Sequence, residues 1–173
     1  MKQIALLRGI NVGGHRKVAM PALKQAFEAL GLSDVQTYIQ SGNVVFGGEA
    51  DRADLEAAIE RAFGFPVPVI LRSAGEWQHL IMDNPYPEQA AADGSKVHLT
   101  LLGAEPTEAG LDALRAIDSG ADEWTRRGSV LYLYTPNGLG QSKLNPDKLG
   151  VLTTTRNWRT VIKLAEMAGV ATS

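Results

Sequence analysis

The chain has 173 residues, with 17 Lys and Arg against 19 Asp and Glu and no cysteine, so it suits one domain or two small ones and excludes disulfides, thiolate zinc sites and cysteine nucleophiles. Its three histidines, at 15, 79 and 98, lack metal-ligand spacing, which predicts a protein without a metal or another cofactor. No apolar run approaches the roughly 20 residues of a membrane span, and Arg8 ends the only short apolar run at the N-terminus. We therefore expect a cytoplasmic protein with no membrane partner.

The first half of the chain predicts six elements. A buried strand at 2–7 and a glycine-rich loop at 8–17 precede a helix that begins near Pro21, a favoured first helical position. Two strands, at 35–40 and 43–46, are joined by a turn at Ser41-Gly42, and a helix from Asp51 leads to an edge strand at 67–71. The order β-α-β-β-α-β is typical of a split, ferredoxin-like unit.

The second half looks similar. Ser73 and Glu76 form a capping box for a short helix. The elements that follow are a strand at 97–102, a helix capped by Thr107, strands at 122–126 and 129–135, a helix near Ser142, and a last helix at about 156–168 outside the repeat. The fold class expected is therefore α+β, with two split β-α-β units at 1–72 and 73–173, antiparallel or mixed sheets with helices on one face, and an extra C-terminal helix.

The charges are polarised along the chain. Residues 1–27 and 124–173 together hold 12 of the 17 basic and 2 of the 19 acidic residues, whereas 28–123 holds the other 5 basic and 17 acidic residues. If the two ends meet in space, one face attracts anions. The alternative is an acidic middle that serves only solubility.

Two loops in the first half form a candidate anion site. A right-handed crossover makes the first two strands parallel, so the loop after the first and the turn after the second lie at one sheet end. Glycines there let backbone amides approach and hold an anion. The candidate ligand-binding residues are Arg8, Asn11, Gly13, Gly14, Lys17, Gln40, Ser41 and Asn43. The alternative is that these residues only build turns.

Cations at two predicted helix starts extend this site. A cation in a first helical turn opposes the helix dipole unless an anion lies nearby. Lys143 beside Ser142 fits that description, although Ser142 could be only a cap. The last helix, with the threonines before it as caps, repeats the pattern, and its candidates are Thr155, Arg156, Asn157 and Arg159. We expect its start to line one concavity with the two loops; a solvated basic face is the alternative.

Three segments carry a resemblance to a known family. Ala5–Gly14, Tyr38–Phe46 and Thr154–Trp158 closely resemble the bacterial family called domain of unknown function 1697, and 136–143 looks like its third loop. The resemblance implies a cytoplasmic α+β fold of two related halves, and no activity.

The function expected from these residues is binding of a phosphate-bearing anionic ligand, either a small molecule such as a nucleotide or the backbone of a nucleic acid. A second hypothesis is an enzyme acting on a phosphorylated small molecule, with Ser41, His15 or Lys143 assisting. A third is a protein-interaction module whose basic face meets an acidic partner.

Overall fold

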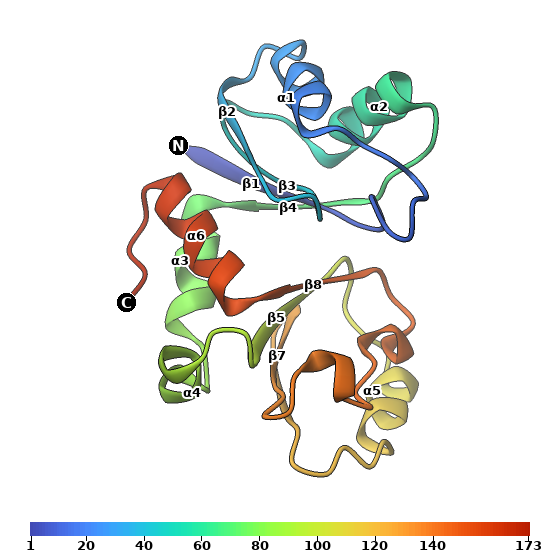
Figure 1. Cartoon of the computed structure of the whole chain (residues 1–173), viewed down its shortest axis with the longest axis vertical. Coiled ribbons are helices and arrows are strands. Elements are labelled where there is room, and N and C mark those ends of the chain that lie inside the picture. The colour runs from blue at the N-terminus through green and yellow to red at the C-terminus, as the bar shows by residue number, and fades with distance from the viewer. The chain divides into compact units, whose positions relative to one another are not determined.

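A computed structural model describes all 173 residues, Met1–Ser173. Two compact units make up the chain (Figure 1): the first unit is residues 1–82 with 163–173, and the second unit is residues 83–162. The predicted boundary after residue 72 differs from this division, because helix α3 (Ala74–Met82) continues directly from strand β4 (Val69–Ser73) and packs on it. The α+β class is confirmed, with two four-stranded antiparallel sheets. No helix has the length and apolarity needed to cross a bilayer.

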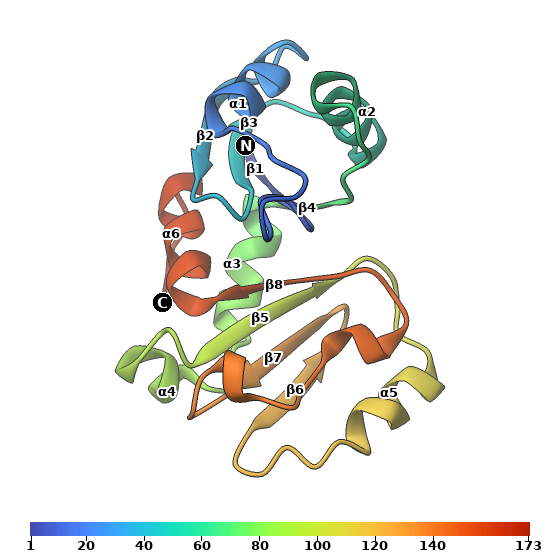
Figure 2. The same cartoon turned by 45° about the vertical axis from the view of Figure 1, so that its right-hand side comes forward.

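The first unit has the strand order β2-β3-β1-β4. Strands β1 and β2 both run antiparallel to β3 between them, so they are parallel to each other, as the crossover rule predicts. Helices α1 and α2 lie side by side on one face of the sheet (Figures 1 and 2). The elements are β1 (Lys2–Leu7), α1 (Met20–Glu28), β2 (Ser33–Tyr38), β3 (Asn43–Gly47) and α2 (Arg52–Phe63), followed by β4 and α3.

Alternation along the strands produces the core of this unit. Every second residue of β1 and β3 faces the helices. These side chains pack against the apolar residues that lie along one side of α1 and α2. Phe27 and Phe46 meet edge to face, with ring centroids 5.5 Å apart. The fully buried members of this core include Ala5, Leu7, Leu23, Phe27, Val44, Phe46, Leu55, Ile59 and Val69.

Local capping signals set the helix ends as expected. Asp51 accepts a hydrogen bond from Asp54 N at 2.8 Å, so α2 begins after it, and α2 ends at Gly64 in the left-handed conformation, with φ 82°. The capping box before α3 is reciprocal, with Glu76 N donating to Ser73 Oγ at 3.1 Å and Ser73 N donating to Glu76 Oε1 at 2.9 Å.

The second unit repeats the topology of the first, with the order β6-β7-β5-β8. Helix α5 and the 3-10 helix η2 cover one face of its sheet (Figure 2), over a core of Leu102, Leu111, Leu114, Leu131, Leu133, Leu144 and Leu149. Thr107 caps α5, accepting from Gly110 N at 3.0 Å. The elements are α4 (Pro87–Ala92), β5 (Val97–Leu102), α5 (Glu108–Arg115), β6 (Glu123–Arg127), β7 (Val130–Tyr134), η1 (Leu139–Gln141), η2 (Pro146–Leu149) and β8 (Thr153–Asn157).

The predicted helix near Ser142 is wrong. The chain there forms the short 3-10 helix η1, then an extended turn in which Ser142 Oγ accepts from Leu144 N at 3.1 Å. Pro146, four residues on, has no N–H to donate to the Ser142 carbonyl, so an α-helix from Ser142 would lose its first hydrogen bond.

The predicted start of the last helix is also wrong. Residues 153–157 form β8, which pairs with β5, and helix α6 (Trp158–Ala168) begins after it. Its capping side chain is Asn157, which accepts from Thr160 N at 3.0 Å, in place of the threonines before it. α6 follows β8 as α3 follows β4, so the last helix belongs to the repeat.

Candidate functional site

The glycine-rich loop of the first unit ends in a tight hairpin. His15 N donates to Val12 O at 2.9 Å, and the two residues between them, Gly13 and Gly14, have φ of 57° and 76°. Positive φ at both central positions defines a type I′ turn, which glycine adopts without steric cost. The N–H groups of Gly13 and Gly14 donate to no group of the protein and remain available to a ligand.

Asn11 ties this loop to the neighbouring turn. Its side chain closes the loop, with Nδ2 donating to Val18 O at 3.0 Å and Oδ1 accepting from Val18 N at 2.9 Å. The same Nδ2 also donates to Gln40 O at 2.8 Å. The predicted meeting of the loop and the turn is therefore confirmed. Because both its Nδ2 and its Oδ1 form hydrogen bonds within the protein, the Asn11 side chain holds the loop against the turn.

Arg16 holds the loop on its other side, a role that no sequence pattern indicates. Its Nη2 donates to Pro66 O at 2.7 Å, and its guanidinium lies 5.4 Å from the centroid of the Phe65 ring. Arg16 O also accepts from Asn11 N at 3.0 Å, which joins the two ends of the loop. Two side chains thus fix the loop against both neighbouring segments.

A cavity of 410 Å³ opens between the loop and the turn, lined by Asn11, Gly14, Lys17, Val18, Ala19 and Gln40. Its lining combines the apolar residues Val18 and Ala19 with the polar residues Lys17 and Gln40. We call residues 8–19 and 39–42 the loop end of the first unit. The loop end carries Arg8, Arg16 and Lys17 and no acidic residue, so its own side chains have a net positive charge.

The other predicted ligand-binding residues of the loop and the turn have contacts within the protein. Asn43 is fully buried, and its Nδ2 donates to Tyr38 O at 2.8 Å and to Ser41 Oγ at 3.1 Å. Arg8 is half-buried, and its backbone N–H donates to Pro68 O at 3.0 Å. These contacts use Asn43 and the Ser41 hydroxyl within the protein, whereas Lys17 and Gln40 are exposed beside the cavity.

Lys143 has surroundings different from those predicted. It lines a cavity of 440 Å³ in the second unit together with Asp118 and Asp122. Because no helix begins at Ser142, the dipole argument for an anion does not apply there. The carboxylates on the opposite loop make this cavity a poor place for a phosphate.

Arg156 lies in strand β8 and not in a first helical turn, so that prediction is wrong. The side chain is buried, and Nη1 donates to Thr154 Oγ1 at 2.7 Å and to Thr155 O at 3.0 Å. The Thr155 hydroxyl meets that of Thr100 on β5 at 2.7 Å. The Arg156 bonds therefore lie within β8, and the Thr155–Thr100 bond joins β8 to β5.

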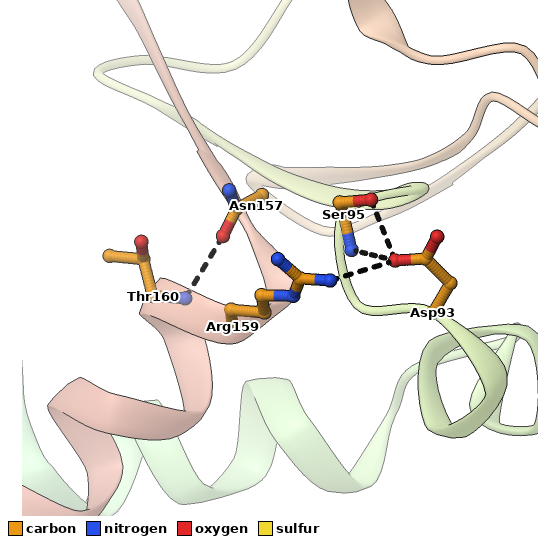
Figure 3. Close-up of polar contacts among 5 residues, drawn as sticks. All are labelled: Asp93, Ser95, Asn157, Arg159 and Thr160. Atoms are coloured by element: carbon orange, nitrogen blue, oxygen red, sulfur yellow. Dashed lines mark hydrogen bonds and ion pairs between the residues drawn. The ribbon is translucent and has the colours of Figure 1, made fainter.

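Arg159 does occupy the first turn of α6, and the structure supplies an anion beside it (Figure 3). Its Nη2 lies 3.3 Å from Asp93 Oδ1, an oxygen that also accepts from Ser95 Oγ at 2.6 Å and from Ser95 N at 2.9 Å. A cation near a helix N-terminus is stabilised by a nearby anion. For Arg159 this anion is the Asp93 carboxylate of the same unit. That Arg156 and Arg159 share a concavity with the loop end stays a prediction.

These contacts predict the titration of Asp93. The two hydrogen bonds from Ser95, and then the charge of Arg159, hold the pKa of Asp93 below its usual range. A depressed folded pKa stabilises the fold above the unfolded pKa, and this stability is lost as the pH falls through the folded pKa. NMR titration should show the pKa of Asp93 rising more in Ser95→Ala than in Arg159→Gln. The reverse order would mean that the ion pair, and not Ser95, controls the carboxylate.

Comparisons with known proteins add the family and support the fold. A solved structure described as conserved bacterial protein SP0830 from Streptococcus pneumoniae is similar over 96% of this chain and 98% of that one, with a TM-score of 0.74 and 22% identity, which speaks for the fold alone. A comparison with curated proteins finds no match. A family model described as "Protein of unknown function (DUF1697)" matches residues 1–132. Because that match covers most of the sequence, the chain belongs to the DUF1697 family.

Proposed function

We propose that the loop end of the first unit binds the phosphate group of an anionic ligand. The observation that carries the proposal is the 410 Å³ cavity, which Lys17 and Gln40 line together with Val18 and Ala19 and which no acidic residue lines. Its volume falls within the range of small-molecule sites, roughly 300–1,000 Å³.

Charge is the first support. The Lys17 ammonium is exposed and forms no ion pair within the protein. A lysine paired to a carboxylate would have to give up that partner to bind phosphate, whereas this one would not. Hydrogen bonds from an ammonium to a phosphate oxygen are charge-assisted and roughly twice as strong as neutral ones.

Preorganisation is the second support. Asn11 and Arg16 fix the loop to the turn and to the segment before β4. A fixed loop loses little conformational entropy on binding. The unpaired N–H groups of Gly13 and Gly14 and the Nε2 of Gln40 then add donors of the kind that surround bound phosphates.

The proposal predicts the effect of Lys17→Gln on the binding of inorganic pyrophosphate, measured by calorimetry at low salt. The loss of a charge-assisted bond should weaken binding by roughly 1.5–3 kcal/mol, more than tenfold. Lys24→Gln is the matched control, because Lys24 is exposed on α1 in the same unit and does not line the cavity. Equal affinities of the two variants, or no binding of pyrophosphate to the wild type, would contradict the proposal.

A further inference from the structure

Ile39 has a backbone conformation that its side chain disfavours. Its φ is +52°, in the left-handed region, where β-branched residues are genuine outliers. Its side chain is 48% exposed, so burial compensates only part of the strain. Asparagine or glycine would fit this backbone better. Strained residues of this kind gather at ligand sites, and Ile39 directly precedes the cavity-lining Gln40.

Val12 is a second exposed aliphatic residue at the loop end. It begins the glycine hairpin and is 64% exposed. Val12 and Ile39 are the chain neighbours of Asn11 and Gln40, which are joined by the 2.8 Å hydrogen bond between the two segments. Neither residue lines the cavity itself, but each is next in the chain to a residue that does. A bare phosphate has no group that would bury them.

We infer that the ligand of this site is a nucleotide, whose base packs on Ile39 and Val12 while its phosphate meets Lys17. This inference rests on the proposed phosphate site. A base has apolar faces for the aliphatic side chains, and its polar edge can accept a hydrogen bond from Gln40 Nε2, while Gln40 Oε1 accepts from Asn11 Nδ2 at 3.3 Å.

The same chemistry could come from a free nucleotide or from one unit of a single strand. Proteins that bind single strands stack successive bases on aromatic rings. No exposed large apolar side chain is aromatic, and at this end of the sheet Tyr38 is half-buried and Phe65 lies under Arg16. The aliphatic contacts therefore favour a free nucleotide.

The test compares ADP with inorganic pyrophosphate, which share the diphosphate and differ in the nucleoside. The wild type should bind ADP about tenfold more tightly than pyrophosphate, as burial of an aliphatic side chain predicts. Ile39→Asn should remove most of this difference and leave the affinity for pyrophosphate within about twofold. Lys17→Gln should weaken both ligands.

Folding of the variant is checked separately. Asparagine tolerates the left-handed conformation, so the melting temperature of Ile39→Asn should equal or exceed that of the wild type. A clearly lower value would show that Ile39 serves the fold, and would overturn the inference.

The outcomes separate the two proposals. If pyrophosphate binds through Lys17 but ADP binds no tighter, or if Ile39→Asn leaves ADP unaffected, the nucleotide inference is wrong and the phosphate site stands. If neither ligand binds, both fail. In a further arm with a ten-nucleotide single strand, tighter binding than ADP that falls in Ile39→Asn would support the base contact and identify a strand as its source.

Discussion

Replacing Gly42 with alanine is expected to lower the free energy of unfolding by about 2–4 kcal/mol. An added Cβ would lie 2.7 Å from Ile10 Cδ1 and 2.9 Å from Leu7 Cβ, closer than carbon atoms approach. The residue also has φ of 91°, which L side chains disfavour. Ile10 is buried at the base of the glycine-rich loop, so relief of the clash would displace the loop. Urea unfolding measures the loss, and pyrophosphate binding should weaken in parallel.

Gly31→Ala is the matched control for this change. Gly31 has a similar φ of 85°, but no atom lies within 4 Å of its added Cβ. Its loss should be only about 1 kcal/mol, from the backbone alone. The difference between the two variants isolates the steric part. Equal losses would show that Leu7 and Ile10 do not pack against the turn as the structure has them.

Replacing Gly110 with alanine should destabilise the second unit by about 2–4 kcal/mol. The added Cβ would lie 2.4 Å from Leu149 O and 2.8 Å from Leu149 C. These are backbone atoms of η2, which cannot rotate away as a side chain would. The clash should separate α5 from η2, whose residues Leu111, Leu114 and Leu149 share one core. Urea unfolding followed by tryptophan fluorescence measures the effect, because Trp124 packs on that core.

Gly75→Ala controls for helix propensity. Gly75 also lies in the first part of a helix, α3, and its added Cβ would meet only Ser73 Oγ, at 4.0 Å. Alanine there should raise stability by about 0.5 kcal/mol, because it restricts the unfolded chain and favours the helix. The two Gly→Ala changes are therefore expected to have opposite signs. A stabilised Gly110→Ala would contradict the close packing of α5 on η2.

Local chemistry in the sequence was enough to predict most elements of the first unit. Asp51 and Gly64 bound α2, and the Ser73–Glu76 pair starts α3, because each cap satisfies backbone groups only a few residues away. The handedness of the β1-α1-β2 crossover predicts that the loop 9–17 lies beside the turn 40–43, and the hydrogen bond from Asn11 to Gln40 confirms it. The charge of the loop end follows from composition alone.

Long-range contacts decided the rest. The threonines before Asn157 can cap a helix or extend a strand, and pairing with β5 made them a strand, with Thr155 meeting Thr100, 55 residues away in the chain. Arg159 resembled a ligand-binding cation because its partner, Asp93, is 66 residues distant. The strain at Ile39 is a backbone dihedral set by the surrounding loop and strands. Sequence patterns report neighbours within a few residues, whereas these features depend on pairs that only the folded chain brings together.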